Sequence, residues 1–283
     1  MKIIRRPEWM QKKISPTIHA DMDWLLMDLH LHTVCREACC PNISECYGSG
    51  QATFLILGAA CTRLCSFCNV AKKVPLPPDP GEPERVAQAV MRLSLKHAVI
   101  TSPTRDDLPD GGSGIFAQTV TAIRNISPQT GIELLIPDFL GVHKSIAEVV
   151  CSQPDIIGHN LETVPRLYHI RPGADYRRSL EVLRTLRELN PVLKTKSGIM
   201  LGLGETESEV LSLFTDLLET GCSYLSIGQY LSPSRDHYPV KGFVPPEQFA
   251  WYRECALAMG VQHVESGPYV RSSYHAERYG EEK

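Results

Sequence analysis

Three cysteines lie close together in the sequence, at Cys61, Cys65 and Cys68, with three residues between the first pair and two between the second. A disulfide would leave one of these thiols unpaired. A structural zinc site uses four ligands in a closed tetrahedron, although a catalytic zinc keeps one position open. A cubane iron–sulfur cluster has four irons, so three thiolates leave one iron without a protein ligand. The count therefore indicates a metal centre that binds a further molecule and does chemistry on it.

A second group of cysteines lies upstream, at Cys35, Cys40 and Cys46, with spacings of four and five residues. Because Cys39 is adjacent to Cys40, spacing alone does not decide which thiols are ligands. A structural zinc knot is one interpretation of this group, and a second iron–sulfur cluster is the other. Either site needs a fourth ligand from another part of the chain.

Alternating strands and helices are expected to position these cysteines. Six apolar segments read as strands, at residues 53–58, 97–103, 131–137, 155–160, 193–201 and 224–231. Amphipathic helices fall between them, and Thr206 with Glu209 resembles a capping box. This alternation predicts parallel strands and a partial (β/α)6 barrel, with a doubly wound open sheet as the alternative. In either fold the loop with Cys61 follows the first strand at its carboxyl end, where active sites form.

The composition limits the class of protein. The chain has 283 residues, 43% hydrophobic and 22% charged, with a net charge of -3, so we expect a globular enzyme-sized domain without a nucleic-acid partner. No apolar run has membrane-spanning length, so no membrane partner is expected either. Ten cysteines without a recognisable secretory signal predict a cytoplasmic location, where clustered cysteines are more often metal ligands than disulfides.

Longer segments extend the cysteine pattern. The two groups are joined by GSGQATFLILGAACTRLCSFCNVA, and further segments read TSPTRDDLPDGG, HNLETVPRLYHIRPGADYRRSL, TKSGIMLGLGET and SGPYVRSSYHA. Together these resemble the lipoyl synthase family of the radical S-adenosylmethionine superfamily, over residues 7–276. The resemblance implies a barrel over residues 51–265, an N-terminal extension over 1–50 and a C-terminal tail over 266–283. Both extensions would cover the mouth of the barrel.

The resemblance implies a catalytic 4Fe–4S cluster on Cys61, Cys65 and Cys68. Its open iron would chelate S-adenosylmethionine, and reduction would give methionine and a 5′-deoxyadenosyl radical that abstracts hydrogen from an unactivated carbon. The implied substrate is an octanoyl chain on a lysine of a carrier domain, into which sulfur is inserted at C6 and C8. Implied partners are therefore the E2 component of a 2-oxoacid dehydrogenase or the glycine-cleavage H protein, an electron donor such as ferredoxin or flavodoxin, and a cluster-repair protein.

The resemblance also implies an auxiliary 4Fe–4S cluster, which would be consumed as the sulfur source. Its ligands would be Cys35, Cys40, Cys46 and Ser273, the second serine of the RSSY segment, and Cys39 would be an extra thiol. Residues 271–274 would then have to fold back across the barrel mouth toward these cysteines. Arg271 would contact a substrate carbonyl or a carboxylate, and Ser272 would be a turn residue.

Three pairs of residues are candidates for contacts with S-adenosylmethionine or the substrate: Asn160 and Glu162, Gly202 and Gly204, and Arg105 and Asp106. Each pair follows a predicted strand. The first pair also fits a helix cap with a first-turn acid, the second a tight strand-to-helix turn, and the third a solvated charged turn.

Three other functions compete with this interpretation. One is another radical S-adenosylmethionine enzyme that inserts sulfur from an auxiliary cluster. Another is an electron-transfer or cluster-carrier protein, although a carrier needs neither an open iron nor a six-stranded scaffold. The third is a zinc-binding structural protein, which would be colourless where iron–sulfur clusters are brown.

Overall fold

The structure is a computed structural model in which residues 6–10, 20–274 and 276 are described. The expected N-terminal extension over 1–50 and C-terminal tail over 266–283 therefore fall partly outside the described residues, which leave out 1–5, 11–19, 275 and 277–283. Within the described parts, no helix is long and apolar enough to cross a membrane.

One sheet of eight strands forms the centre of the molecule, in the order β1 to β8. The strands are β1 (His32–Thr33), β2 (Thr53–Leu55), β3 (His97–Thr101), β4 (Gly131–Leu135), β5 (Ile156–Gly158), β6 (Lys194–Leu201), β7 (Tyr224–Gln229) and β8 (His263–Gly267). The six predicted strands are confirmed as β2 to β7. Two strands were not predicted: β1 pairs antiparallel with β2, and β8 pairs parallel with β7.

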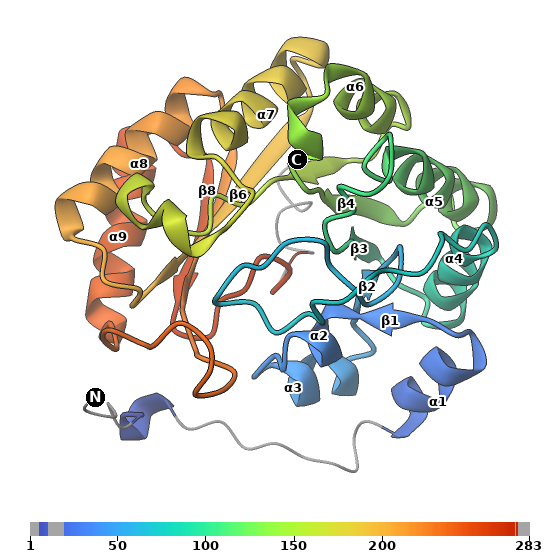
Figure 1. The fold of residues 1–283 in the computed structure, drawn as a ribbon, viewed down its shortest axis with the longest axis horizontal. Helices are drawn as coiled ribbons and strands as arrows, with labels where there is room; N and C mark the ends of the chain where they lie inside the picture. The colour runs from blue at the N-terminus through green and yellow to red at the C-terminus, as the bar shows by residue number, and fades with distance from the viewer. Residues whose placement is uncertain (1–5, 11–19, 275, 277–283) are drawn as a thin grey trace.

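Helices follow most of the parallel strands and lie outside the ring of strands (Figure 1). They are α4 (Glu82–Arg92), α5 (Ser113–Ile126), α6 (His143–Cys151), α7 (Tyr176–Leu189), α8 (Glu207–Glu219) and α9 (Pro246–Met259), with 3-10 helices η3 (Phe139–Gly141) before α6 and η4 (Pro165–Ile170) before α7. The capping box of Thr206 and Glu209 is confirmed at the start of α8.

The strands follow one another around an open ring, as a partial barrel requires. Neighbouring strands from β2 to β8 are parallel, and β1 and β8 are the two ends of the sheet in the described residues. A doubly wound sheet would show a reversal of strand order, which is absent from the described strands. The buried faces of the helices pack on this ring through side chains such as Val86, Phe116, Val149, Leu186 and Phe214.

The two extensions approach the barrel from different sides. Near the start of the chain, η1 (Glu8–Met10), α1 (Ala20–Asp28), α2 (Val34–Glu37) and α3 (Ile43–Gly48) precede the barrel, and α2 and α3 lie beside β2 at the open edge of the ring (Figure 1). After β8 the chain turns inward: the carbonyl oxygen of Val270 lies so close to Gly228 of β7 that a Cβ there would approach it to 2.1 Å. This turn brings the two extensions together.

Candidate active site

The loop with Cys61, Cys65 and Cys68 leaves β2 at its carboxyl end, as predicted. The Cys61 N–H donates to the carbonyl oxygen of Ala71 at 2.8 Å, and the Cys68 N–H donates to that of Cys65 at 3.2 Å. The Arg63 N–H points at Cys61 Sγ, at 3.4 Å. These contacts hold the loop in a compact turn that gathers the three thiols.

Burial and mutual repulsion favour the protonated thiol in this loop. The pKa of Cys68 is raised to about 11, mainly by burial, with smaller increases from Cys65 and Cys61 and an opposing hydrogen bond from the Val70 backbone. Burial also raises the pKa of Cys65, while the positive charge of Arg171 opposes the rise. Cys65 and Cys68 therefore need a nearby cation or metal cluster to be held as thiolates.

Arg63, inside the cysteine motif, anchors the loop to two other strands. It is 7% exposed and donates to both oxygens of Asp106, at 2.7 and 3.0 Å, and to both of Asp138, at 3.0 and 2.6 Å. Arg178 donates to Asp138 as well, at 2.8 Å. Burial alone would raise the pKa of Asp138, but the hydrogen bonds from these arginines outweigh it and lower that pKa. Bidentate pairs of this kind fix a loop in one geometry.

A second cation, the half-buried Arg171, lies beside the same loop. Ser66 donates to the carbonyl oxygen of Ile170 through both its N–H, at 2.9 Å, and its hydroxyl, at 3.1 Å. These two hydrogen bonds hold Arg171, the residue after Ile170, close to the cysteine loop. The Arg171 guanidinium donates to the Leu161 carbonyl at 2.8 Å and to the Tyr168 hydroxyl at 2.6 Å. Its Nε is buried with no partner among the described residues.

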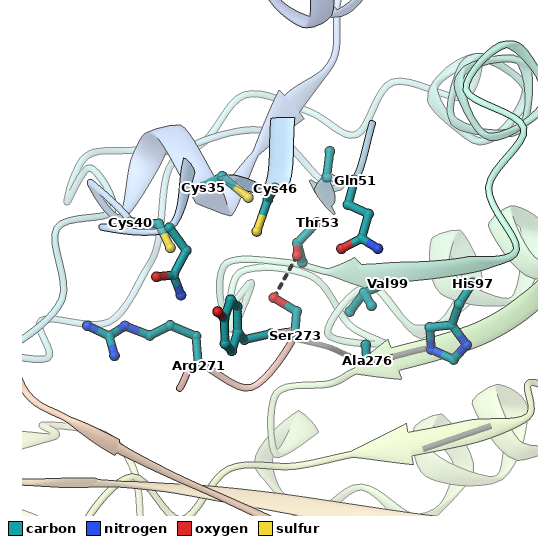
Figure 2. Close-up of a pocket in the computed structure, with 13 residues that line it drawn as sticks. Cys35, Cys40, Cys46, Gln51, Thr53, His97, Val99, Arg271, Ser273 and Ala276 are labelled. Atoms are coloured by element: carbon teal, nitrogen blue, oxygen red, sulfur yellow. Dashed lines mark hydrogen bonds between the residues drawn. The ribbon is translucent and has the colours of Figure 1, made fainter. Parts of the chain in front are cut away.

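The second cysteine group lines a separate small pocket. Cys35, Cys40 and Cys46 point into it from α2, α3 and the segment between them, and Ser273 enters from the C-terminal segment (Figure 2). Burial raises the pKa of Cys35 to about 11, and Cys40 adds to the rise. Arg271, Ser273 and Tyr274 line the same pocket as the three cysteines, so residues 271–274 fold toward these cysteines as expected. The pocket reaches the first residues of β2 and β3, deeper than the barrel mouth where the tail was expected.

The C-terminal segment is tied to two parts of the barrel and to the N-terminal extension. The Thr53 hydroxyl of β2 donates to Ser273 Oγ at 2.7 Å (Figure 2). Asn160 Nδ2 donates to Ser272 Oγ, also at 2.7 Å, so Ser272 is an anchor in addition to the turn residue that was predicted. Asn42 Nδ2 donates to the Tyr269 carbonyl at 2.7 Å.

Arg271 turns its guanidinium toward the second cysteine group. It donates to its neighbouring carbonyl at Val270, at 2.6 Å. Burial lowers the pKa of Arg271, and electrostatic interactions with its neighbours oppose the change. The side chain lines both the pocket of the second group and the larger cavity beside it. Its predicted contact with a substrate remains a prediction.

One larger cavity joins the two cysteine groups. Its volume is about 250 Å³, and its lining is mostly apolar. Cys68 borders it from the first group, and Cys35 and Cys40 border it from the second. Asn160 and Glu162, two of the predicted contact residues, also line it and are hydrogen-bonded to each other at 3.1 Å. No α-helix begins at this pair, so the alternative of a helix cap is wrong.

The other predicted contact residues lie outside both cavities. Gly202 and Gly204 form the turn from β6 to α8 with φ of 93° and 107°, and a Cβ at Gly202 would lie 2.1 Å from Gln229 Nε2. Both therefore serve the tight turn that was their alternative explanation. Arg105 is 1% exposed and pairs with Asp107, so a solvated turn is wrong for it. Asp106 is paired with Arg63. A contact of Arg105 or Asp106 with a cofactor stays a prediction.

The donor sets fit iron–sulfur clusters better than single ions. Among the described residues, no three His, Cys, Asp or Glu side chains converge as ligands of one metal ion. Ligands of a cubane bind different irons at separate corners, so they surround a space instead of meeting at a point. Three cysteines and a serine around one pocket match that requirement. The buried Cys35 thiol, whose pKa is raised, would lose its proton when iron binds.

Four residues with roles at the site were missed or misjudged from the sequence: Arg63, Arg171, Thr53 and Ser272. The first two lie inside recognisable segments, yet an arginine in a loop is ordinarily a solvated charge. Only the folded chain shows that both guanidinium groups are buried against acids or carbonyls. The two hydroxyl residues make contacts with residues more than 100 positions away, which spacing does not reveal.

Comparison with known proteins agrees with this geometry. The Radical SAM superfamily model matches residues 55–217. The lipoyl synthase of Geotalea uraniireducens (strain Rf4) is 72% identical over 280 residues, covering 99% of both chains, and that of Geobacter metallireducens is 70% identical over 279 residues, with the same coverage.

Solved structures share the fold at low sequence identity. Methylornithine synthase (PylB) aligns over 86% of this chain and 81% of its own, with a TM-score of 0.56 and 13% identity. Streptococcus suis SuiB aligns over 94% of this chain and 58% of its own, with a TM-score of 0.58 and 11% identity. These likenesses support the partial barrel alone. The family model and the full-length relatives establish that the chain belongs to the lipoyl synthase family of the radical S-adenosylmethionine superfamily.

Proposed function

We propose that this chain inserts two sulfur atoms, at C6 and C8, into an octanoyl chain held on a lysine of a carrier domain. The observation that carries the proposal is the 250 Å³ cavity that is bordered by Cys68 on one side and by Cys35 and Cys40 on the other. An extended alkyl chain in this mostly apolar space has access to both cysteine sites. An electron-transfer or cluster-carrier protein has no need of such a cavity.

The cofactors are S-adenosylmethionine and two 4Fe–4S clusters. We assign the catalytic cluster to Cys61, Cys65 and Cys68, and the auxiliary cluster to the pocket that Ser273 completes. When bound, these groups supply a radical that abstracts hydrogen from an unactivated carbon and the sulfur that replaces it. The chain's own task is to hold both sites rigidly around the substrate and to exclude water and competing reactions.

Three polar residues, Arg63, Arg171 and Asn160, hold the two cysteine sites and the cavity wall in position. Arg63 fixes the catalytic loop through its two carboxylates, and Arg171 places positive charge beside Cys65. Asn160 connects Glu162 at the cavity wall to Ser272 of the C-terminal segment. Cofactor contacts are accordingly proposed for Asn160 and Glu162, which line the cavity. Burial raises the pKa of Glu162, and Arg171 and Asn160 oppose the rise.

We further propose a division into an N-terminal extension over 1–50, a barrel over 51–265 and a tail over 266–283. The carrier is proposed to be an E2 domain or an H protein, with ferredoxin or flavodoxin as electron donor and a separate protein that rebuilds the auxiliary cluster. The proposed location is the cytoplasm.

The test is reconstitution followed by product analysis. Anaerobically reconstituted protein should hold about eight irons per chain, four in each cluster. With S-adenosylmethionine, dithionite and an octanoylated carrier, mass spectrometry should detect two new C–S bonds and 5′-deoxyadenosine. Cofactor cleavage without any C–S bond, from protein with both clusters loaded, would reject the proposal.

A further inference from the structure

Two exposed lysines lie directly beside the catalytic loop. The Cys61 N–H donates to the Ala71 carbonyl at 2.8 Å, and Ala71 also forms an isolated parallel bridge with Ala60. Lys72 and Lys73 therefore follow a residue that touches the first cysteine of the motif. Both lysine side chains are exposed.

No acidic residue neutralises this pair within the part of the chain that the structure describes, since no ion pair of either lysine is found there. The next acid along the chain, Asp79, is paired instead with Arg85, at 2.7 Å. The chain as a whole carries a net charge of -3, so this basic pair is opposite in sign to the net charge.

Exposed apolar side chains lie in the cysteine loop and in the segment that follows Lys72 and Lys73. Leu64, between the first two cysteines, is 60% exposed, and Val74 and Leu76, just after the lysines, are 90% and 81% exposed. Large apolar side chains that are this exposed, next to unneutralised charge, are typical of surfaces that bind another protein. We call residues 64 and 72–76 the basic–apolar face.

We propose that the basic–apolar face docks a small acidic protein that delivers single electrons to the catalytic cluster. The proposal rests on the proposed function, since only a cluster that must be reduced needs a donor. One electron leaves the donor and enters the catalytic cluster, and no bond is made or broken in the docking step itself.

Charge and position both favour this partner. An acidic carrier is repelled by the net charge of the chain but attracted by Lys72 and Lys73, so its approach is steered to the side of the catalytic loop. Electron transfer slows steeply with distance, and this segment directly follows Ala71, whose carbonyl accepts a hydrogen bond from the Cys61 N–H. Transient redox complexes use small interfaces, for which a short segment suffices.

The octanoylated carrier fits this face less well. Its acyl chain has to enter the 250 Å³ cavity, and none of the residues of the basic–apolar face lines that cavity. The carrier domain is therefore expected to bind elsewhere, which gives the experiment a second possible outcome.

The test follows reduction of the catalytic cluster by flavodoxin hydroquinone in stopped flow, at low ionic strength, with both clusters loaded. Lys72→Glu/Lys73→Glu should slow the second-order rate by about tenfold or more, and added salt should shrink the difference. Lys73→Glu alone should have a smaller effect. Lys96→Glu is the matched control, because Lys96 is equally exposed but precedes β3 at the opposite end of the strands.

Dithionite separates docking from chemistry. With dithionite as reductant the double variant should make product at the wild-type rate, and its iron content should be unchanged. Leu64→Ser/Leu76→Ser should weaken flavodoxin binding without changing its salt dependence. Equal flavodoxin rates in wild type and Lys72→Glu/Lys73→Glu would overturn the proposal. So would a raised KM for the octanoylated carrier with an unchanged flavodoxin rate, which would assign the face to the carrier. Failure of the wild type to form product with dithionite would instead reject the proposed function.

Discussion

The hydroxyl of Thr53 donates a 2.7 Å hydrogen bond to the hydroxyl of Ser273, across 220 residues of sequence. Thr53 begins β2 and Ser273 lies in the segment after β8, so the contact joins the first parallel strand to the end of the chain. It also fixes the oxygen of Ser273 at the pocket of Cys35, Cys40 and Cys46. A serine held in this way by a donor is suited to act as an oxygen ligand.

Replacing Ser273 should therefore separate the two activities. Ser273→Ala should keep S-adenosylmethionine cleavage near the wild-type rate, because the catalytic loop is not touched. It should slow sulfur insertion by at least about a hundredfold, in the range found for loss of a well-placed catalytic donor. Quantitation of 5′-deoxyadenosine and lipoyl product in the same samples checks this. Normal product formation by the Ala variant would show that Ser273 is not needed.

Thr53 should act through the position of Ser273. Thr53→Val keeps the shape of the side chain and removes the donor, so we expect sulfur insertion to slow by roughly tenfold, equivalent to about 1.4 kcal/mol. Thr53→Ser keeps the hydroxyl and should restore most of the rate. Equal rates in the Val and Ser variants would mean that the hydrogen bond has no role.

Arg171 should raise the reduction potential of the catalytic cluster, because its positive charge stabilises the extra electron. Arg171→Met should make the midpoint potential more negative by on the order of 50–100 mV, the equivalent of about 1–2 kcal/mol for one charge at a partly shielded site. Redox titration followed by EPR spectroscopy measures the shift. As a control, Arg166→Met removes an exposed arginine of the same loop and should leave the potential unchanged. A shift of the same size in both variants would contradict a local effect.

His159 should make the folded state sensitive to acid. Burial lowers its pKa from 6.5 to about 4, with Arg171 adding to the decrease, while its Nδ1–H donates to the Ile136 carbonyl at 2.9 Å. Because the unfolded chain binds this proton more readily, the free energy of unfolding should fall as the pH drops from about 6.5 to about 4, by about 3 kcal/mol in all.

Urea unfolding at several pH values tests this. His159→Gln should flatten the profile in that window, whereas substitution of the exposed His169 by Gln should not. An unchanged slope in His159→Gln would assign the acid sensitivity to other groups.

Cluster loading should release protons. The thiols of Cys35 and Cys68 have pKa values raised to about 11, mainly by burial, so both are protonated at neutral pH in the absence of iron. Each must lose its proton on binding iron. Cluster reconstitution should therefore become faster, and the cluster more tightly bound, as the pH is raised from 7 to 9. An indicator dye in weak buffer measures the release. Loading that is independent of pH over this range would contradict the neutral state of these thiols.

Much of the barrel was predictable because several of its parallel strands lie in short apolar runs, as in TFLILG at residues 53–58, which contains β2. The strands that were missed lack that signal: β1 has two residues, and β8 carries His263 and Glu265 among few apolar positions. Both depend on pairing with a neighbour already in place. Tertiary contact, and not local propensity, decides such strands.

The cluster ligands were indicated by cysteine spacing, but the residues that hold them in place were not. Spacing within a loop is a local property, whereas the contacts of Arg63 with Asp106 and Asp138 join three loops. Gly202 shows the opposite error: its type suggested a close approach to a ligand, and the close neighbour is Gln229. Sequence shows that a glycine is required there without showing what requires it.

The most direct test of the central claim, that the two cysteine groups have different roles, compares two triple variants in one assay. Each is incubated with S-adenosylmethionine, dithionite and octanoylated carrier, and both 5′-deoxyadenosine and lipoyl product are quantified. Replacing Cys61, Cys65 and Cys68 by alanine should abolish both products. Replacing Cys35, Cys40 and Cys46 should preserve 5′-deoxyadenosine and abolish the lipoyl product. Full S-adenosylmethionine cleavage by the first variant, or lipoyl product from the second, would contradict the division of roles.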